Sequence, residues 1–74
     1  MTLNHLKAGA QAIVEDLNND DGMRRRLQDI GLTKGTRVQC VRRSPLGDPV
    51  AFEIRGAVIA LRSEDSALVQ VRQA

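Results

Sequence analysis

Aromatic residues and cysteine are almost absent from the chain. Of its 74 residues, one is Phe and one is Cys, and none is Trp or Tyr. A single Cys cannot form an internal disulfide bond, and with the single His it cannot supply the four ligands of a structural zinc site. Without aromatic side chains the chain offers no stacking platform for single-stranded nucleic acid and no aromatic groove for proline-rich peptides. The core of such a short chain must therefore be aliphatic, and it is small.

Long apolar stretches are also missing. The longest uncharged stretch near the start covers residues 8–14, whereas a membrane-spanning helix needs roughly 20 apolar residues. Residues 1–14 also lack the apolar segment of a signal peptide. Because the free thiol of Cys40 suits a reducing compartment, we expect a cytoplasmic protein.

Charge is nearly balanced overall but unevenly distributed. The chain has 11 basic and 9 acidic residues, which gives a net charge of +2. Residues 15–21 carry four acids and no base, whereas residues 24–43 carry seven bases and one acid. Such a basic segment is typical either of a protein with an anionic partner or of an ordinary solvated surface. Because successive residues of a helix point about 100° apart, the three arginines of residues 24–26 fan around it, which argues against insertion into a DNA groove.

One short helix is predicted after the first strand. Asp20 or Asp21 can cap its start, because a side-chain oxygen accepts an otherwise unpaired N–H of the first turn. An apolar stripe at spacings of four and three consists of Met23, Leu27 and Ile30. We expect this stripe to be buried. Gly31 stands where a helix commonly ends in the left-handed conformation.

Alternating apolar and polar residues predict five short strands. They cover residues 11–17, 36–43, 50–55, 57–62 and 67–72. Residues 57–62 are almost continuously apolar, so we expect this strand to be more buried than the others. Residues 63–66 form a polar link with room for one helical turn. The regular spacing indicates a mainly β fold, either a small barrel or a tightly curled sheet, and closure of a barrel would remove its exposed edges.

Two segments resemble ligand-binding motifs but depart from them. GLTKGT at residues 31–36 resembles a phosphate-binding loop, yet Lys34 precedes Gly35 where that motif needs Gly before Lys. Residues 16–27 resemble a calcium-binding loop, yet Asp21 and Leu27 stand where Gly and Glu are required. We therefore expect neither a nucleotide site nor a calcium site.

Catalytic and metal-binding constellations are not recognisable. Cys40 occupies an apolar position of an alternating strand, which is typical of a small core residue. His5 lies in a polar N-terminal segment that we expect to be flexible, so a nucleophile–histidine pair is not expected. We expect no enzyme activity, no metal or cofactor bound by this chain, and no small-molecule substrate.

Several short motifs follow one another along the chain: RLQDIGLTKGT at residues 26–36, Val38, RRSPLGDP at residues 42–49, Gly56, and ALR at residues 60–62. Taken together they resemble the FeoA family, the small cytoplasmic component of bacterial ferrous iron transport. The resemblance extends over nearly the whole chain, so we expect residues 1–74 to form one domain. Ile30 stands where the family commonly has Leu. The resemblance implies an SH3-like β-barrel of about five strands with one short α-helix after the first strand.

The resemblance also implies a partner. FeoA works beside FeoB, a polytopic membrane protein with a cytoplasmic GTPase domain, so the chain is expected to reach the inner membrane through it. The same domain forms the C-terminal part of metal-responsive transcription regulators of the DtxR type, whose helix-turn-helix this chain lacks. Self-association of the chain is a further alternative, because the sequence does not determine the oligomeric state.

Candidate residues fall into two groups. The expected partner-binding residues are Leu46, Asp48, Leu32, Arg26, Arg42 and Arg43. The expected structural turn residues are Gly31, Gly35, Pro45, Gly47, Pro49 and Gly56. For three of the first group a structural role is the alternative: Leu46 and Leu32 could seal the barrel, and Asp48 could accept hydrogen bonds from nearby backbone N–H groups.

The leading functional prediction is a non-catalytic accessory protein that binds and modulates FeoB. An arginine supplied in trans could affect GTP hydrolysis. The alternative functions are a small barrel that binds nucleic acid through Arg37, Arg42 and Arg43, and a metal-dependent regulatory module.

Overall fold

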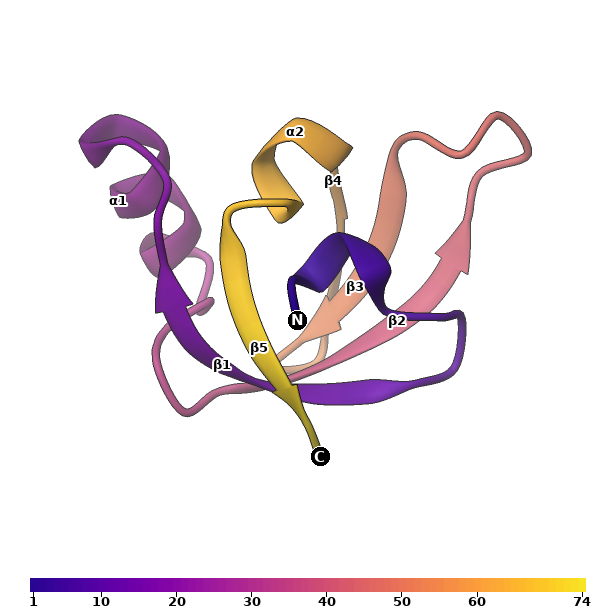
Figure 1. Ribbon diagram of the computed structural model, residues 1–74, viewed down its shortest axis with the longest axis horizontal. Coiled ribbons are helices and arrows are strands. Elements are labelled where there is room, and N and C mark those ends of the chain that lie inside the picture. The colour runs from indigo at the N-terminus through magenta and orange to yellow at the C-terminus, as the bar shows by residue number, and fades with distance from the viewer.

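The fold is a single five-stranded antiparallel sheet with three short helical segments, and the computed structural model describes residues 1–74 (Figure 1). The elements are η1 (Leu3–His5), β1 (Gln11–Leu17), α1 (Asp21–Asp29), β2 (Arg37–Arg43), β3 (Val50–Ile54), β4 (Ala57–Leu61), α2 (Ser63–Ser66) and β5 (Val69–Gln73). The sheet order is β4-β3-β2-β1-β5. The molecule measures 30 × 23 × 22 Å, with α1 and the β2–β3 loop at opposite ends of the long axis in Figure 1.

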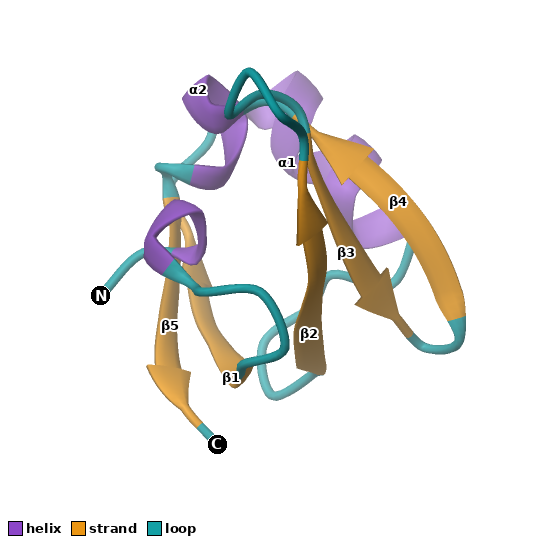
Figure 2. Cartoon of the chain, turned by 90° about the vertical axis from the view of Figure 1, so that its right-hand side faces the viewer, coloured by secondary structure: helices purple, strands orange, loops and turns teal.

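The predicted mainly β fold is confirmed, but the expected closure of the barrel is not. The sheet curls strongly in Figure 2, yet β4 pairs only with β3, and β5 pairs only with β1 among the strands. Both outer strands therefore keep one edge without a strand partner. The expectation for β4 was also wrong: Val58 is 62% exposed and only Leu61 is buried. An apolar run belongs to a fully covered strand only when both faces of the sheet are packed, and β4 lies at an edge.

The core collects the apolar residues that alternate along the strands. On β3, for example, Val50, Phe52 and Ile54 are fully buried, while Glu53 between them is exposed. This inward and outward alternation is the two-residue period of a strand with one covered face. The 15 buried apolar residues form one cluster, of which Phe52 is the largest side chain.

The N-terminal segment is part of this core, which corrects the expectation of a flexible end. Leu3 and Leu6 are fully buried. The backbone N–H of Val71 donates to the carbonyl of Met1 at 2.9 Å, which ties the first residue to β5. Figure 1 shows η1 above the curled sheet beside α2, where it covers the open end of the core. Two leucines in a polar context gave no periodic signal from which this role could be predicted.

The ends of α1 follow from particular residues. The carboxylate of Asp20 accepts the backbone N–H of Met23 at 2.9 Å, so Asp20 is the helix cap. At the other end Gly31 has φ +101°, and the N–H of Leu32 returns to the carbonyl of Leu27 at 2.9 Å. This is the helix ending that a left-handed glycine permits. It turns Leu32 into the core, where that side chain is fully buried.

The apolar stripe of α1 is only partly buried. Leu27 is buried and Met23 is half-buried, but Ile30 is 38% exposed. The prediction of a fully buried stripe is therefore wrong for Ile30, because Ile30 is the C-cap that follows α1 and lies at a groove instead of in the core.

Candidate partner-binding site

An apolar groove of about 530 Å³ lies between α1, the second half of β4 and the start of α2. It is lined by Met23, Arg26, Leu27, Ile30, Ile59, Ala60, Leu61, Arg62 and Asp65. Six of the nine are hydrophobic, and the three charged residues are two arginines and one aspartate. An apolar floor with a few charged groups is typical of a site that accepts apolar side chains of a partner.

The free edge of β4 adds backbone groups to the same region. β4 pairs with β3 along its whole length, from Val50↔Leu61 to Ile54↔Ala57, and no strand lies on its other side. An unpaired edge presents N–H and C=O groups to which an extended peptide can add as a further strand. Sequence reasoning missed this groove, because its floor combines residues of α1 and β4 that no local pattern connects.

Leu46 is the most exposed large apolar residue of the chain. It lies in the β2–β3 loop, and its exposed fraction is 94%. It therefore does not seal the barrel. The loop is held by its own hydrogen bonds: Gly47 N donates to Ser44 O at 2.8 Å, and Ser44 Oγ donates to Asp48 O at 3.0 Å. Leu46 is thus exposed to solvent on a loop whose conformation is held by its own hydrogen bonds.

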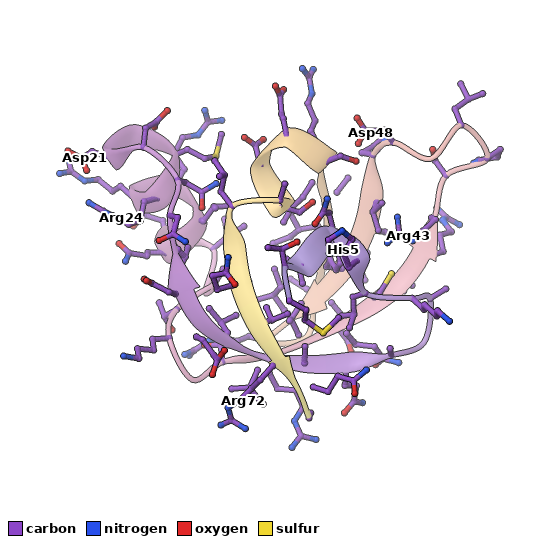
Figure 3. All side chains as sticks on the ribbon, in the orientation of Figure 1. His5, Asp21, Arg24, Arg43, Asp48 and Arg72 are labelled. Carbon is purple, nitrogen blue, oxygen red and sulfur yellow. The ribbon has the colours of Figure 1, made fainter.

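Asp48 anchors this loop to α2. Its Oδ1 accepts the backbone N–H of Ser63 at 2.9 Å and the hydroxyl of Ser63 at 3.3 Å. Figure 3 shows Asp48 at the base of the loop, near α2. The carboxylate thus has a structural task, and it connects the Leu46 loop to the helix that borders the groove.

The other expected partner-binding residues are dispersed. Leu32 is fully buried and offers no surface. Arg43 is exposed, but its Nη2 donates to the carbonyls of Asn4 at 2.6 Å and Leu6 at 2.9 Å and so holds the N-terminal segment (Figure 3). Arg42 is exposed on β2, and Arg26 lines the groove. The six residues therefore do not form one patch.

The six expected turn residues all lie outside regular elements. The four glycines among them, Gly31, Gly35, Gly47 and Gly56, have φ of +101°, +89°, +85° and +86°. Pro45 and Pro49 flank the tip of the Leu46 loop. These positions set the backbone and carry no functional group.

Metal-ligating side chains do not gather anywhere in the chain. No three residues of the types His, Cys, Asp and Glu come together. His5 is exposed and its Nδ1 lies 3.2 Å from Thr2 Oγ1, whereas Cys40 is fully buried.

None of the helices has the length and apolar character needed to traverse a membrane.

The buried thiol of Cys40 should be unreactive in the folded protein. Burial raises its pKa above the ordinary value, and the nearby Arg43 opposes this only in part. Since the thiolate is the nucleophile, we expect a thiol reagent such as DTNB to react at least about 100-fold more slowly with the native than with the urea-unfolded chain. Equal rates would show that Cys40 is accessible.

The raised pKa of Cys40 also makes the stability of the fold depend on pH. Above the ordinary thiol pKa of about 8.5 the unfolded chain releases a proton that the folded chain retains, so stability should fall as pH rises through this range. The Cys40→Ala variant should lose this part of the pH dependence, which urea titrations between neutral and alkaline pH would measure.

The family model of the FeoA domain matches residues 1–73 of this chain. The chain belongs to the FeoA family. It is 32% identical over 71 residues to the Fe(2+) transport protein A/Fe(2+) transporter FeoB fusion protein of Porphyromonas gingivalis, covering 96% of this chain but only 8% of the fusion protein.

Solved FeoA structures share the fold. The solution NMR structure of FeoA from Chlorobium tepidum has a TM-score of 0.94 at 34% identity, covering 99% of this chain and 70% of that one. FeoA of Stenotrophomonas maltophilia, solved with zinc and described as a prokaryotic SH3 domain protein, has a TM-score of 0.82 at 33% identity, covering 97% of this chain and 89% of that one. The SH3-like class expected from the sequence is thereby confirmed.

Proposed function

We propose that this protein is an accessory of ferrous iron transport that binds the cytoplasmic part of a FeoB-type transporter and modulates it. The observation that carries the proposal is the relative in which an Fe(2+) transport protein A is fused to the transporter FeoB. Covalent fusion keeps two domains at a high effective concentration. The proposed contact needs a complementary surface on the FeoA domain.

The Leu46 loop is the proposed anchor of that surface. An exposed leucine gains roughly 1.5–3 kcal/mol when a partner buries it. The hydrogen bonds between Ser44, Gly47 and Asp48 hold the loop before binding, so little conformational entropy is lost on docking. Arg42, exposed on the strand that leads into the loop, is the proposed charged contact at its rim.

The groove is the proposed second contact. Ile30 and Arg26 lie on the α1 side of the groove, and an apolar side chain of the transporter would cover Ile30. The arginine can pair with an acidic group beside that apolar side chain, and Arg26 is the proposed candidate for an effect on GTP hydrolysis. Leu32 is buried, and the exposed Asp48 and Arg43 are engaged in hydrogen bonds within the chain, so these three are not proposed as contacts.

Substituting Leu46 tests the proposal. We expect Leu46→Asp to weaken binding to detergent-solubilised, full-length FeoB by about 30-fold or more, because the apolar anchor is lost and a charge must be desolvated. Biolayer interferometry with GDP and with a non-hydrolysable GTP analogue measures the affinity. The matched control is Leu68→Asp, which places the same charge at another exposed leucine and should retain most of the affinity.

Two results would count against the proposal. Absence of binding in both nucleotide states contradicts association with FeoB. Binding that Leu46→Asp and Leu68→Asp weaken equally contradicts the assignment of Leu46 as the anchor. Thermal unfolding of each variant shows whether the chain is still folded, which we expect since both side chains are exposed.

A further inference from the structure

A second depression, of about 410 Å³, lies where the turn before β2 meets the β3–β4 hairpin. Its lining consists of Lys34, Gly35, Thr36, Arg37 and Arg55. Three of these residues are cations, none is acidic and none is hydrophobic. None of the three cations takes part in an ion pair of the folded chain. The depression therefore gathers three cationic residues without an ion-pair partner in the folded chain.

Arg55 reaches this depression from an uncommon backbone conformation. It has φ +52° and is followed by Gly56 at +86°, so both central residues of the hairpin turn are left-handed. Asn, Asp or Gly is the usual first residue of such a turn. A long cationic side chain at this position is an outlier of the kind that collects at functional sites.

The side chain of Arg55 is also held in place. Its stem lies over Gly31, where an added Cβ would stand only 2.9 Å from Arg55 Cδ. Its guanidinium Nη2 lies 3.5 Å from the hydroxyl of Thr36. Gly31 thus serves two purposes, since it ends α1 and leaves room for the arginine.

Arg37 lines the same depression as Arg55. The β2–β3 ladder ends at the pair Val38↔Ile54, and Arg37 and Arg55 are the residues next to that pair along the chain. Arg37 Nη1 donates to the neutral Gln11 Oε1 at 3.2 Å, which leaves its charge uncompensated. An anion bound in the depression would supply the opposite charge that both arginines lack.

We propose that Lys34, Arg37 and Arg55 form a binding site for the terminal phosphate group of a phosphorylated ligand. A phosphate dianion matches three cationic residues around one depression better than a single carboxylate does, and planar guanidinium groups bind its oxygens in pairs. Because the lining has no hydrophobic residue, the site recognises the phosphate group and leaves the rest of the ligand outside. A nucleic acid is disfavoured, since the site is a single depression in a chain with 1% aromatic residues.

This site differs from a nucleotide-binding loop. In such a loop backbone N–H groups hold the phosphates, but here Gly35 N donates to Val14 O at 2.8 Å and Thr36 N to Thr33 O at 3.0 Å. The proposed contacts are therefore the side chains. The site also lies before the first residue of β4, whereas the apolar groove uses the second half of that strand, so the proposal does not depend on binding to FeoB.

Titration with inorganic phosphate at constant ionic strength tests the proposal. Using ¹⁵N-labelled protein, we expect saturable shifts of the Gly35 and Gly56 amides and of the Nε–H signals of Arg37 and Arg55, with a dissociation constant on the order of 1 mM. Shifts that do not saturate, or that spread equally over the other arginines, would overturn the site.

Two variants and a control locate the binding. Arg55→Asn removes one charge of the site but keeps a residue that tolerates the left-handed turn, and Arg37→Gln removes the charge of the other arginine that lines the depression. Each should weaken phosphate binding at least about fivefold, because one charge-assisted contact is lost. Lys7→Gln removes an equal charge from an exposed residue outside the site and should change the affinity less than about twofold. Equal effects of all three variants would overturn the proposal.

Vesicles distinguish the source of the phosphate. Binding to phosphatidic acid vesicles, but not to phosphatidylcholine vesicles, that Arg55→Asn abolishes identifies a lipid headgroup. Saturable binding of inorganic phosphate with no vesicle binding identifies a soluble phosphate compound. Both results support the site, whereas vesicle binding that Arg55→Asn leaves unchanged contradicts it.

Discussion

Replacing Phe52 with Ala should leave most molecules of this protein unfolded. Phe52 is the only aromatic residue and the largest fully buried side chain. It lies in the middle of β3, paired with Cys40 on β2 and Ile59 on β4. Truncating a buried Phe to Ala costs about 3–5 kcal/mol, and the core of such a short chain supplies a net stability of about the same size.

Circular dichroism in a urea titration measures this loss. Val58→Ala is the matched control, because Val58 lies on the adjoining strand but is 62% exposed, and we expect it to cost less than about 1 kcal/mol. A Phe52→Ala variant that unfolds at the same urea concentration as Val58→Ala would contradict a core centred on Phe52.

Truncating the two N-terminal leucines should lower the free energy of unfolding by a comparable amount. In the double variant Leu3→Ala/Leu6→Ala, two fully buried side chains are truncated. Single buried Leu→Ala changes cost about 2–5 kcal/mol, so the pair should lose at least about 4 kcal/mol even if the cavity partly collapses. Strand pairing gives this segment little further support, because its one β-bridge to the sheet is the isolated pair Thr2↔Gln70.

Hydrogen exchange shows whether the double variant loses stability only near the N-terminus or throughout the chain. The amide of Val71 bonds to the carbonyl of Met1, so its protection should fall together with the free energy of unfolding. Lys7→Ala, which truncates an exposed residue of the same segment, is the control and should change neither quantity. Unaltered stability of the double variant would show that residues 1–6 lie on a core that is complete without them.

The elements of the fold could be predicted from local signals. The cap at Asp20, the ending at Gly31 and the alternation of Val50, Phe52 and Ile54 each depend on neighbours a few residues away. The burial of Leu3 and the exposure of β4 could not be predicted in this way. Both depend on which strands end up at the edges, and that is decided by pairing between distant segments.

The candidate site was predictable only in part. The sequence singled out Leu46, but the same loop could have folded over the barrel, and only the structure assigns it an exposed fraction of 94%. Arg55 was not singled out, because it follows Thr36 by 19 residues and reaches it only through the β2–β3 pairing. The resemblance to a phosphate-binding loop covers Lys34 and Gly35, but it is a single linear motif. The positive charge of the depression comes from two separate parts of the chain, residues 34–37 and Arg55.

The hydrogen bonds of Asp48 connect the two apolar surfaces. The carboxylate joins the Leu46 loop to Ser63, and Arg62 and Asp65 on either side of Ser63 line the groove. If a ligand at the groove changes this bond, it changes the affinity of the Leu46 loop for its proposed partner by some factor, and occupation of Leu46 must then change the affinity of the groove by the same factor. A single carboxylate is thus the route by which one proposed contact would depend on the other.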